Sequence, residues 1–348
     1  MANIKELKEL ALHAARHTAP TNYSCENVDD ALAGEFRKMA SSINEFQRNK
    51  YDIFEIMIET ADEVVPKKVI DQVAMFAEVK TVAQGQKAMF KRKVGKNRAR
   101  KFLTQVGLSG VYETFRLDAE TFEVSAHAVG GAGTIDFERM LDGAETMSDV
   151  MDVITEGLTD AAFYEIHRAL QAAFSAAGRP AANKKLVNSF DAQKMQELIG
   201  VVRAYGQGAV IFACPEFIAA MGPDAIVPPA AAIQGVYSPD DIDAIHRTGY
   251  IKIFRGCPVI EIPQSYTDNS NTTTQINPQY AYVLPTGGEK VVKLVFEGQT
   301  QMWDQINRDQ SIEINAYKKM GAAVISHHNW GIYKNEGITD PSADMYGF

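Results

Sequence analysis

The chain has 348 residues, and 35 Lys and Arg stand against 44 Asp and Glu, so its formal net charge of −9 argues against a protein that coats nucleic acid. The hydrophobic fraction of 46% is ordinary for a globular protein, and no run approaches the roughly 18 apolar residues of a membrane-spanning helix. Three cysteines without CxxC spacing exclude a disulfide framework.

The chain is predicted to begin with helices. Residues 3–17 form a short one, and a second runs from about 28 to 48. The second carries an apolar stripe at spacings of three and four, made of Val28, Leu32, Phe36, Met39, Ile43 and Phe46. We interpret residues 1–50 as an arm whose stripe contacts a partner surface, and 51–72 as a linker helix. The alternative is an ordinary helical edge of a domain.

Residues 73–125 are predicted to form a long hairpin. Two segments rich in Val, Phe and Thr flank the turn sequence VGKNRA. The tip, residues 87–102, holds eight basic residues and no acid: Lys87, Lys91, Arg92, Lys93, Lys96, Arg98, Arg100 and Lys101. A further strand follows, and the run GGAGT at 130–134 is predicted to break it.

A long helix is predicted over residues 144–177. One face is apolar and carries Met147, Met151, Ile154, Leu158 and Ala161. The opposite face is acidic and carries Glu145, Asp149, Asp152, Glu156 and Asp160. No Lys or Arg lies between 142 and 160, so the like charges along this face repel one another.

The second half of the chain reads as an α/β unit followed by strands. Residues 185–262 hold a capped helix (SFDAQKMQELIGVVRAYG) and a buried strand (GAVIFAC). A polar loop and several strands fill 263–335, and SIEINAY places Ile312, Ile314 and Ala316 on one face. Residues 336–348 form a C-terminal tail.

The basic hairpin tip and the acidic helix face are complementary in charge. A hairpin tip reaches a neighbouring copy more easily than its own helix, so we infer a head-to-tail contact between subunits, which propagates into rings or shells. Two alternatives stay open. In the first, both surfaces are solvated and their charges are screened by salt. In the second, the hairpin binds nucleic acid, with Phe90 and Phe102 stacking on bases.

No catalytic, metal-binding or cofactor-binding motif stands out. GGAGT lacks the GxGxxG order of a dinucleotide site, and the adjacent His327 and His328 would point to opposite faces of a strand. We therefore predict a protein that is not an enzyme and that needs neither cofactor nor metal.

The order of elements resembles that of a known family. The helical arm, the basic hairpin, the junction GGAGTIDFERMLDG, the long helix, the α/β unit and the closing strands from VFEGQTQMWDQ to NWGIYK follow in turn. This order resembles the major capsid proteins of tailed double-stranded DNA bacteriophages, which have the Hong Kong 97-type fold, an α+β fold.

The resemblance implies a division of the chain. Residues 1–50 would be the arm, 73–125 the extended loop, 126–184 the peripheral domain with the spine helix, and 185–262 the axial domain, while 263–335 would return to the peripheral domain. The hairpin would lie on a neighbour's peripheral domain, the arm would reach adjacent subunits, and residues 215–250 would point toward the capsomer centre.

The resemblance also implies a function. Copies of the chain would form hexamers and pentamers of an icosahedral phage head around packaged DNA, which the inner face would contact only weakly. Scaffolding and portal proteins would be separate partners, with no membrane involved. The protein would reside in the virion, and in the host cytoplasm during assembly. An encapsulin-like compartment and a DNA-binding protein remain the alternatives.

Overall fold

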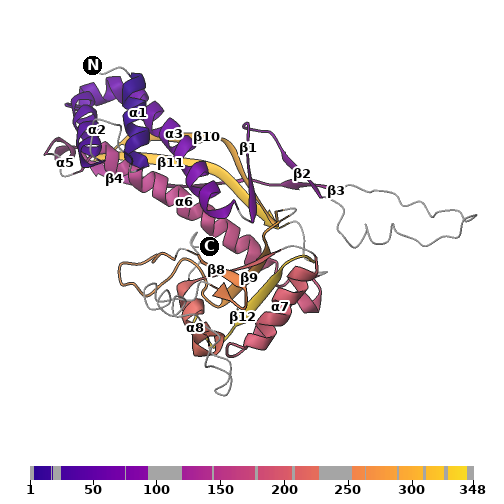
Figure 1. Cartoon of the computed structure of the whole chain (residues 1–348). Helices are drawn as coiled ribbons and strands as arrows, with labels where there is room; N and C mark the ends of the chain where they lie inside the picture. Colours follow the sequence, from indigo (N-terminus) through magenta and orange to yellow (C-terminus); the bar gives the residue numbers. More distant parts are fainter. Residues whose placement is uncertain are drawn as a thin grey trace, which may run out of the picture.

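The structure, a computed structural model, describes residues 4–16, 18, 25–74, 76–92, 120–142, 145–176, 179–205, 208–226, 253–262, 264–287, 290–308, 311–324 and 328–342. Figure 1 shows a long four-stranded sheet with helices along it, a second sheet with its own helices, and a narrow hairpin that extends from the body. Residues 227–252 of the predicted axial domain, most of the hairpin tip and the end of the tail lie outside the described residues.

The four-stranded sheet has the order β1-β10-β11-β4. Its strands are β1 (Ala77–Val82), β10 (Val292–Ile306), β11 (Ser311–Val324) and β4 (His127–Asp136). The alternation predicted for SIEINAY is confirmed, because Ile312, Ile314 and Ala316 are all buried on the helix-covered side. β1 runs parallel to β10 and so belongs to this sheet, although the sequence had assigned residues 73–125 to the hairpin.

The glycine run in β4 does not break the strand. β4 continues through residues 130–134 and pairs antiparallel with β11, with Gly130 opposite Tyr317 and Gly133 opposite Ile314. At Gly130 an added Cβ would lie 2.2 Å from the carbonyl oxygen of Ala316. Glycine is needed there because the two backbones approach closely, so a residue predicted to end the strand instead permits its pairing.

We expect Gly130→Ala to lower the free energy of unfolding by about 1–3 kcal/mol, because the added methyl group forces β4 and β11 apart. Gly131→Ala is the matched control, since no atom lies within 4 Å of a Cβ at Gly131, and it should change stability by less than about 0.5 kcal/mol. Urea unfolding of both variants measures the difference. Equal effects would contradict the close approach at Gly130.

Two long helices, α3 (Ile43–Val73) and α6 (Met147–Ala172), cover one face of this sheet. α6 begins at Thr146, whose side chain accepts from the backbone N–H of Asp149 while the Asp149 carboxylate accepts from the backbone N–H of Thr146. This capping box fixes the start of α6, so the helix is shorter than the predicted span of 144–177. Its predicted apolar face is confirmed, since Met147, Met151 and Leu158 are buried.

The N-terminal region folds onto the same helices. α1 (Ile4–Ala15) and α2 (Cys25–Met39) pack against α3, and α2 also contacts α6. The single helix predicted from about 28 to 48 is in fact two, because the Ser42 side chain accepts from the backbone N–H of Glu45 and starts α3 anew. The predicted boundary between arm and linker at residue 50 therefore falls inside one continuous helix.

The six-stranded sheet has the order β5-β12-β9-β6-β8-β7. Its strands are β5 (Lys184–Val187), β12 (Gly331–Asn335), β9 (Tyr280–Pro285), β6 (Ala209–Ala213), β8 (Cys257–Glu261) and β7 (Ile253–Phe254). β6 is buried throughout, as predicted. The sequence had placed β9 and β12 in the peripheral domain, but they join this sheet, where β9 pairs with both β6 and β12.

Two helices accompany this sheet, α7 (Ala192–Ala204) and α8 (Pro215–Ile226). The cap predicted for SFDAQ is confirmed, since the Asp191 carboxylate accepts from the backbone N–H groups of Gln193 and Lys194. Two short helical elements are also present in the described residues. They are α5 (Phe137–Asp142), which follows β4, and the 3-10 turn η1 (Ala181–Asn183).

A common hydrophobic core joins the two sheets. The second half of α6, with Ile166 and Leu170, packs in one cluster with Phe212, Trp330 and strand residues of both sheets. Beyond the end of α6, the buried Arg179 lies 4.0 Å over the Trp330 ring and donates through Nε to the Ala173 carbonyl oxygen at 2.7 Å. The helix C-terminus is thereby capped and linked to Trp330, the residue directly before β12.

Candidate subunit-contact surfaces

The hairpin is anchored to the body at its base. β2 (Ala88–Arg92) pairs antiparallel with β3 (Glu120–Val124), and Phe90 stacks on Phe122 with ring centroids 5.9 Å apart. Phe90 is only 4% exposed and packs with Val295 of β10. It is therefore part of a small core and is not available to stack on nucleotide bases.

The exposed face of β2 carries two of the predicted basic residues. Lys87, just before the strand, pairs with Glu123 at 2.9 Å, and Lys91 is exposed. Between them Met89 is 55% exposed, although it is a large apolar residue. The Arg92 side chain and Lys93, Lys96, Arg98, Arg100 and Lys101 lie outside the described residues.

The predicted acidic face of α6 is more varied than its sequence indicates. Glu145 precedes the helix and pairs with Arg139 at 3.1 Å, while Asp149 serves in the capping box. Asp152 is partly buried and Glu156 is exposed. Burial, and secondarily the Glu156 charge, raises the pKa of Asp160. The face therefore presents exposed carboxylates at Asp149 and Glu156, while Glu145, Asp152 and Asp160 are partly buried.

The apolar stripe of the predicted arm is covered by the chain itself. Val28, Leu32, Phe36 and Phe46 are at most 1% exposed, and they share a core cluster with α1, α3 and the start of α6. Met39 and Ile43 pack against the same cluster. The helices of residues 4–50 pack against their own chain, because α3 provides an apolar surface for the stripe. The sequence had predicted that a neighbouring subunit would provide this surface. A contact of this region with another subunit stays a prediction.

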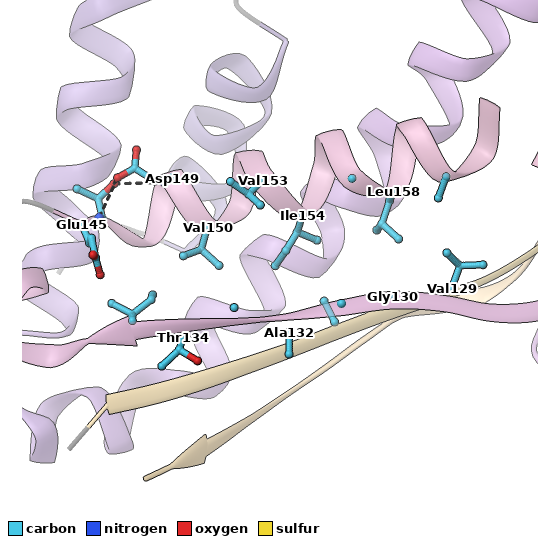
Figure 2. A pocket seen from close by; sticks show the side chains of 17 residues that line it. Val129, Gly130, Ala132, Thr134, Glu145, Asp149, Val150, Val153, Ile154 and Leu158 are labelled. Atoms are coloured by element: carbon cyan, nitrogen blue, oxygen red, sulfur yellow. Dashed lines mark hydrogen bonds between the residues drawn. The ribbon is translucent and has the colours of Figure 1, made fainter. Parts of the chain in front are cut away.

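A groove of about 470 Å³ separates the first half of α6 from β4. Figure 2 shows Val150, Val153, Ile154 and Leu158 of α6 on one side and β4, from Val129 to Thr134, on the other. Glu145 and Asp149 stand at one end. Val153 is 70% exposed, so a large apolar side chain faces solvent beside the groove.

This groove was not predicted from the sequence, although the sequence contains a signal for it. Gly131 and Gly133 fall on the same face of β4 as the buried Val129 and Ile135, because strand residues alternate. Two core-facing positions thus lack a side chain. The predicted strand break at GGAGT is therefore wrong, because glycines at alternate positions of a continuous strand leave space on one of its faces.

Two properties of the described residues bear on the kind of site. Within the described residues, no helix is long and apolar enough to span a membrane. In the same part of the chain, no group of three or more His, Cys, Asp or Glu side chains is arranged to hold a metal ion.

Solved structures with a similar fold are capsids and related shells. The capsid of a native GTA particle aligns with a TM-score of 0.51 and 10% identity, over 76% of this chain and 89% of that chain. The capsid of the cyanophage P-SCSP1u gives 0.50 and 9%, over 77% and 86%. The SrpI encapsulin of Synechococcus elongatus gives 0.46 and 15%, over 76% and 86%. No curated protein matches the chain.

A sequence family covers nearly the whole chain. The family described as SPbeta prophage-derived putative capsid protein YonB matches residues 6–334. The fold is the α+β Hong Kong 97-type fold predicted from the sequence, with its long helix, two sheets and projecting hairpin. The chain therefore belongs to the YonB family of phage capsid proteins and is a structural capsid protein.

Proposed function

We propose that many copies of this chain form the icosahedral head of a tailed phage, as hexamers and pentamers that enclose packaged double-stranded DNA. The family match over residues 6–334 carries this proposal. The net charge of −9 agrees with it, because a wall that binds DNA only weakly does not hinder packaging or ejection. Scaffolding and portal proteins would be separate chains, and assembly would take place in the host cytoplasm.

The contact between subunits would be head-to-tail. The basic hairpin of one copy would lie on the acidic first half of α6 of the next. The described strands of the hairpin, β2 and β3, lie toward the opposite end of the four-stranded sheet from α5 and the start of α6 (Figure 1). The described part of the hairpin therefore lies far from the first turns of α6 in the same chain, which favours a contact between copies. A contact of this kind is heterologous, and it generates a ring when the rotation between neighbouring copies closes.

We expect the purified chain to form closed shells of megadalton mass, visible by light scattering and electron microscopy. Changing Arg92, Lys93, Arg98 and Arg100 together to Glu should abolish them, because the hairpin would then repel the acidic face of its neighbour. The shells should contain DNA when isolated from infected cells. A protein cargo without DNA would instead indicate a compartment of the encapsulin kind.

The matched control changes four exposed cations elsewhere to Glu: Lys38, Lys67, Lys184 and Lys194. It alters the net charge equally and should assemble. Adding Asp152→Lys and Glu156→Lys to the hairpin variant should restore part of the assembly, and Asp149 is kept because it caps α6. Normal shells from the four-Glu hairpin variant would refute the proposed contact.

A further inference from the structure

The groove between β4 and α6 is open because side chains are missing along it. In β4, Gly131 and Gly133 occupy the two core-facing positions between Val129 and Ile135, and Gly157 of α6 lines the same space. A Cβ added at any of these three glycines would meet nothing within 4 Å. Gly131 and Gly133 do not have positive φ angles, so the backbone does not require glycine there. The volume of about 470 Å³ therefore results from the choice of side chains and not from the path of the backbone.

The groove is elongated and follows both of its walls (Figure 2). The strand wall runs from Val129 to Ile135, which is about 20 Å at roughly 3.3 Å per residue. The helix wall runs from Asp149 to Ala161, which is about 18 Å at roughly 1.5 Å per residue. Apart from one end, the side chains that line it are mostly aliphatic, as Ile154 is. The shape and the lining therefore match an unbranched alkyl chain.

The charged groups of the groove are carboxylates at one end. Glu145 and Asp149 stand there together, and no Lys, Arg or His belongs to the described lining. Arg139 pairs with Glu145 at 3.1 Å, whereas no cation of the described residues pairs with Asp149. The backbone N–H and the hydroxyl of Thr146 both donate to Oδ2 of Asp149, so its Oδ1 can accept from a ligand. This end is therefore complementary to a positively charged group.

We propose that the groove binds an amphiphile with a single alkyl chain and an ammonium head group. The chain lies between β4 and α6, and the head group lies beside Glu145 and Asp149. A mostly apolar pocket of several hundred Å³ with a few polar groups at a fixed place is typical of small-molecule sites. The ligand carries a net positive charge, because the two carboxylates would repel the phosphate of a choline lipid. The site lies within one copy of the chain, so it does not depend on the assembly proposed above.

The first test is calorimetric titration of the full chain with dodecyltrimethylammonium, below the concentration at which it forms micelles. We expect one bound molecule per chain and a negative heat-capacity change, because apolar surface is buried. Hexyltrimethylammonium should bind at least ten-fold more weakly, since each buried methylene group raises affinity roughly three- to four-fold. Dodecanoate and dodecylphosphocholine test the head group and should also bind at least ten-fold more weakly. Equal affinity for either of these two overturns the proposal.

The second test fills the groove. Gly133→Leu places an apolar side chain where nothing lies within 4 Å of the Cβ, so the chain should fold, and its urea midpoint checks this. Its affinity for dodecyltrimethylammonium should fall at least ten-fold. Gly200→Leu, at an exposed glycine of α7 with equally open surroundings, is the control and should bind as the parent does. Both variants keep the net charge of −9, so general attraction of a cation is the same in each. Equal affinities of Gly133→Leu and the parent overturn the site.

The third test needs no substitution and locates the ligand directly. The probe is an alkyltrimethylammonium with a diazirine at the far end of its chain, which reacts with nearby residues on irradiation. With the head group beside Glu145, the diazirine should label the other end of the groove, around Val129 and Leu158. Mass spectrometry of peptides identifies the labelled residues, and excess dodecyltrimethylammonium should reduce the labelling at least ten-fold. Labelling confined to other segments of the chain overturns the proposal and leaves the capsid function standing.

Discussion

Asp62→Ala should lower the free energy of unfolding by about 3–5 kcal/mol, because it leaves a buried ammonium group without its counter-ion. Lys318 of β11 is 2% exposed, and its Nζ lies 2.6 Å from Asp62 Oδ1. The same carboxylate accepts from the backbone N–H of Thr300 at 3.0 Å and from its hydroxyl at 2.6 Å. One carboxylate of α3 therefore satisfies donors from both β10 and β11.

The neighbouring Glu63→Ala is the matched control for this prediction. Glu63 also pairs with two cations, Arg16 and Lys67, but its side chain is 43% exposed. Its loss should cost less than about 1 kcal/mol. The double variant Asp62→Leu/Lys318→Met should recover most of the loss, because an apolar pair removes the buried charge. Similar urea midpoints for Asp62→Ala and Glu63→Ala would contradict the importance of burial.

The second large effect concerns pH. His167 of α6 is buried, shares a hydrogen bond of 3.1 Å through Nδ1 with the Tyr282 hydroxyl of β9, and burial lowers its pKa from 6.5 to about 3. Below pH 6.5 the unfolded chain takes up a proton that the folded chain does not bind. The stability associated with neutral His167 is therefore complete above pH 6.5 and is lost progressively as the pH falls toward 3.

Between pH 7 and pH 5 we expect His167 to account for a loss of about 2 kcal/mol, since each pH unit below 6.5 costs roughly 1.4 kcal/mol. Urea unfolding at the two pH values measures this loss. His167→Gln is the control, because it keeps a polar group near Tyr282 but does not titrate. It should lose about 2 kcal/mol less than the parent between the same pH values. Equal losses in both chains would show that His167 does not titrate on unfolding.

Local patterns in the sequence predicted the elements that are set by local physics. Alternation identified β11 through Ile312 and Ile314, and the Asp191 cap identified α7. One local signal was present but missed. Ser42 and Glu45 have the spacing of a capping box, which marks a new helix start at the point where one continuous helix had been predicted.

Pairing between distant segments could not be predicted in the same way. β1 lies parallel to β10, with Ala77 opposite Val292, and no local pattern specifies a partner so far along the chain. The same reason explains why β9 and β12 were assigned to the wrong sheet. The apolar stripe of Val28, Leu32 and Phe36 was identified correctly as a contact surface, but its partner is α3 of the same chain.

The shared core around the second half of α6 has a mechanical consequence. Because side chains of α6, of the four-stranded sheet and of the six-stranded sheet pack in one cluster, the two sheets are coupled through this helix in the part of the chain that the structure describes. A force applied at a contact between copies is then transmitted through the subunit as through a rigid body. The curvature of a shell built from such subunits is set by the angles at which neighbouring subunits meet. Variants that alter shell size are therefore expected at the contact surfaces and not in the core.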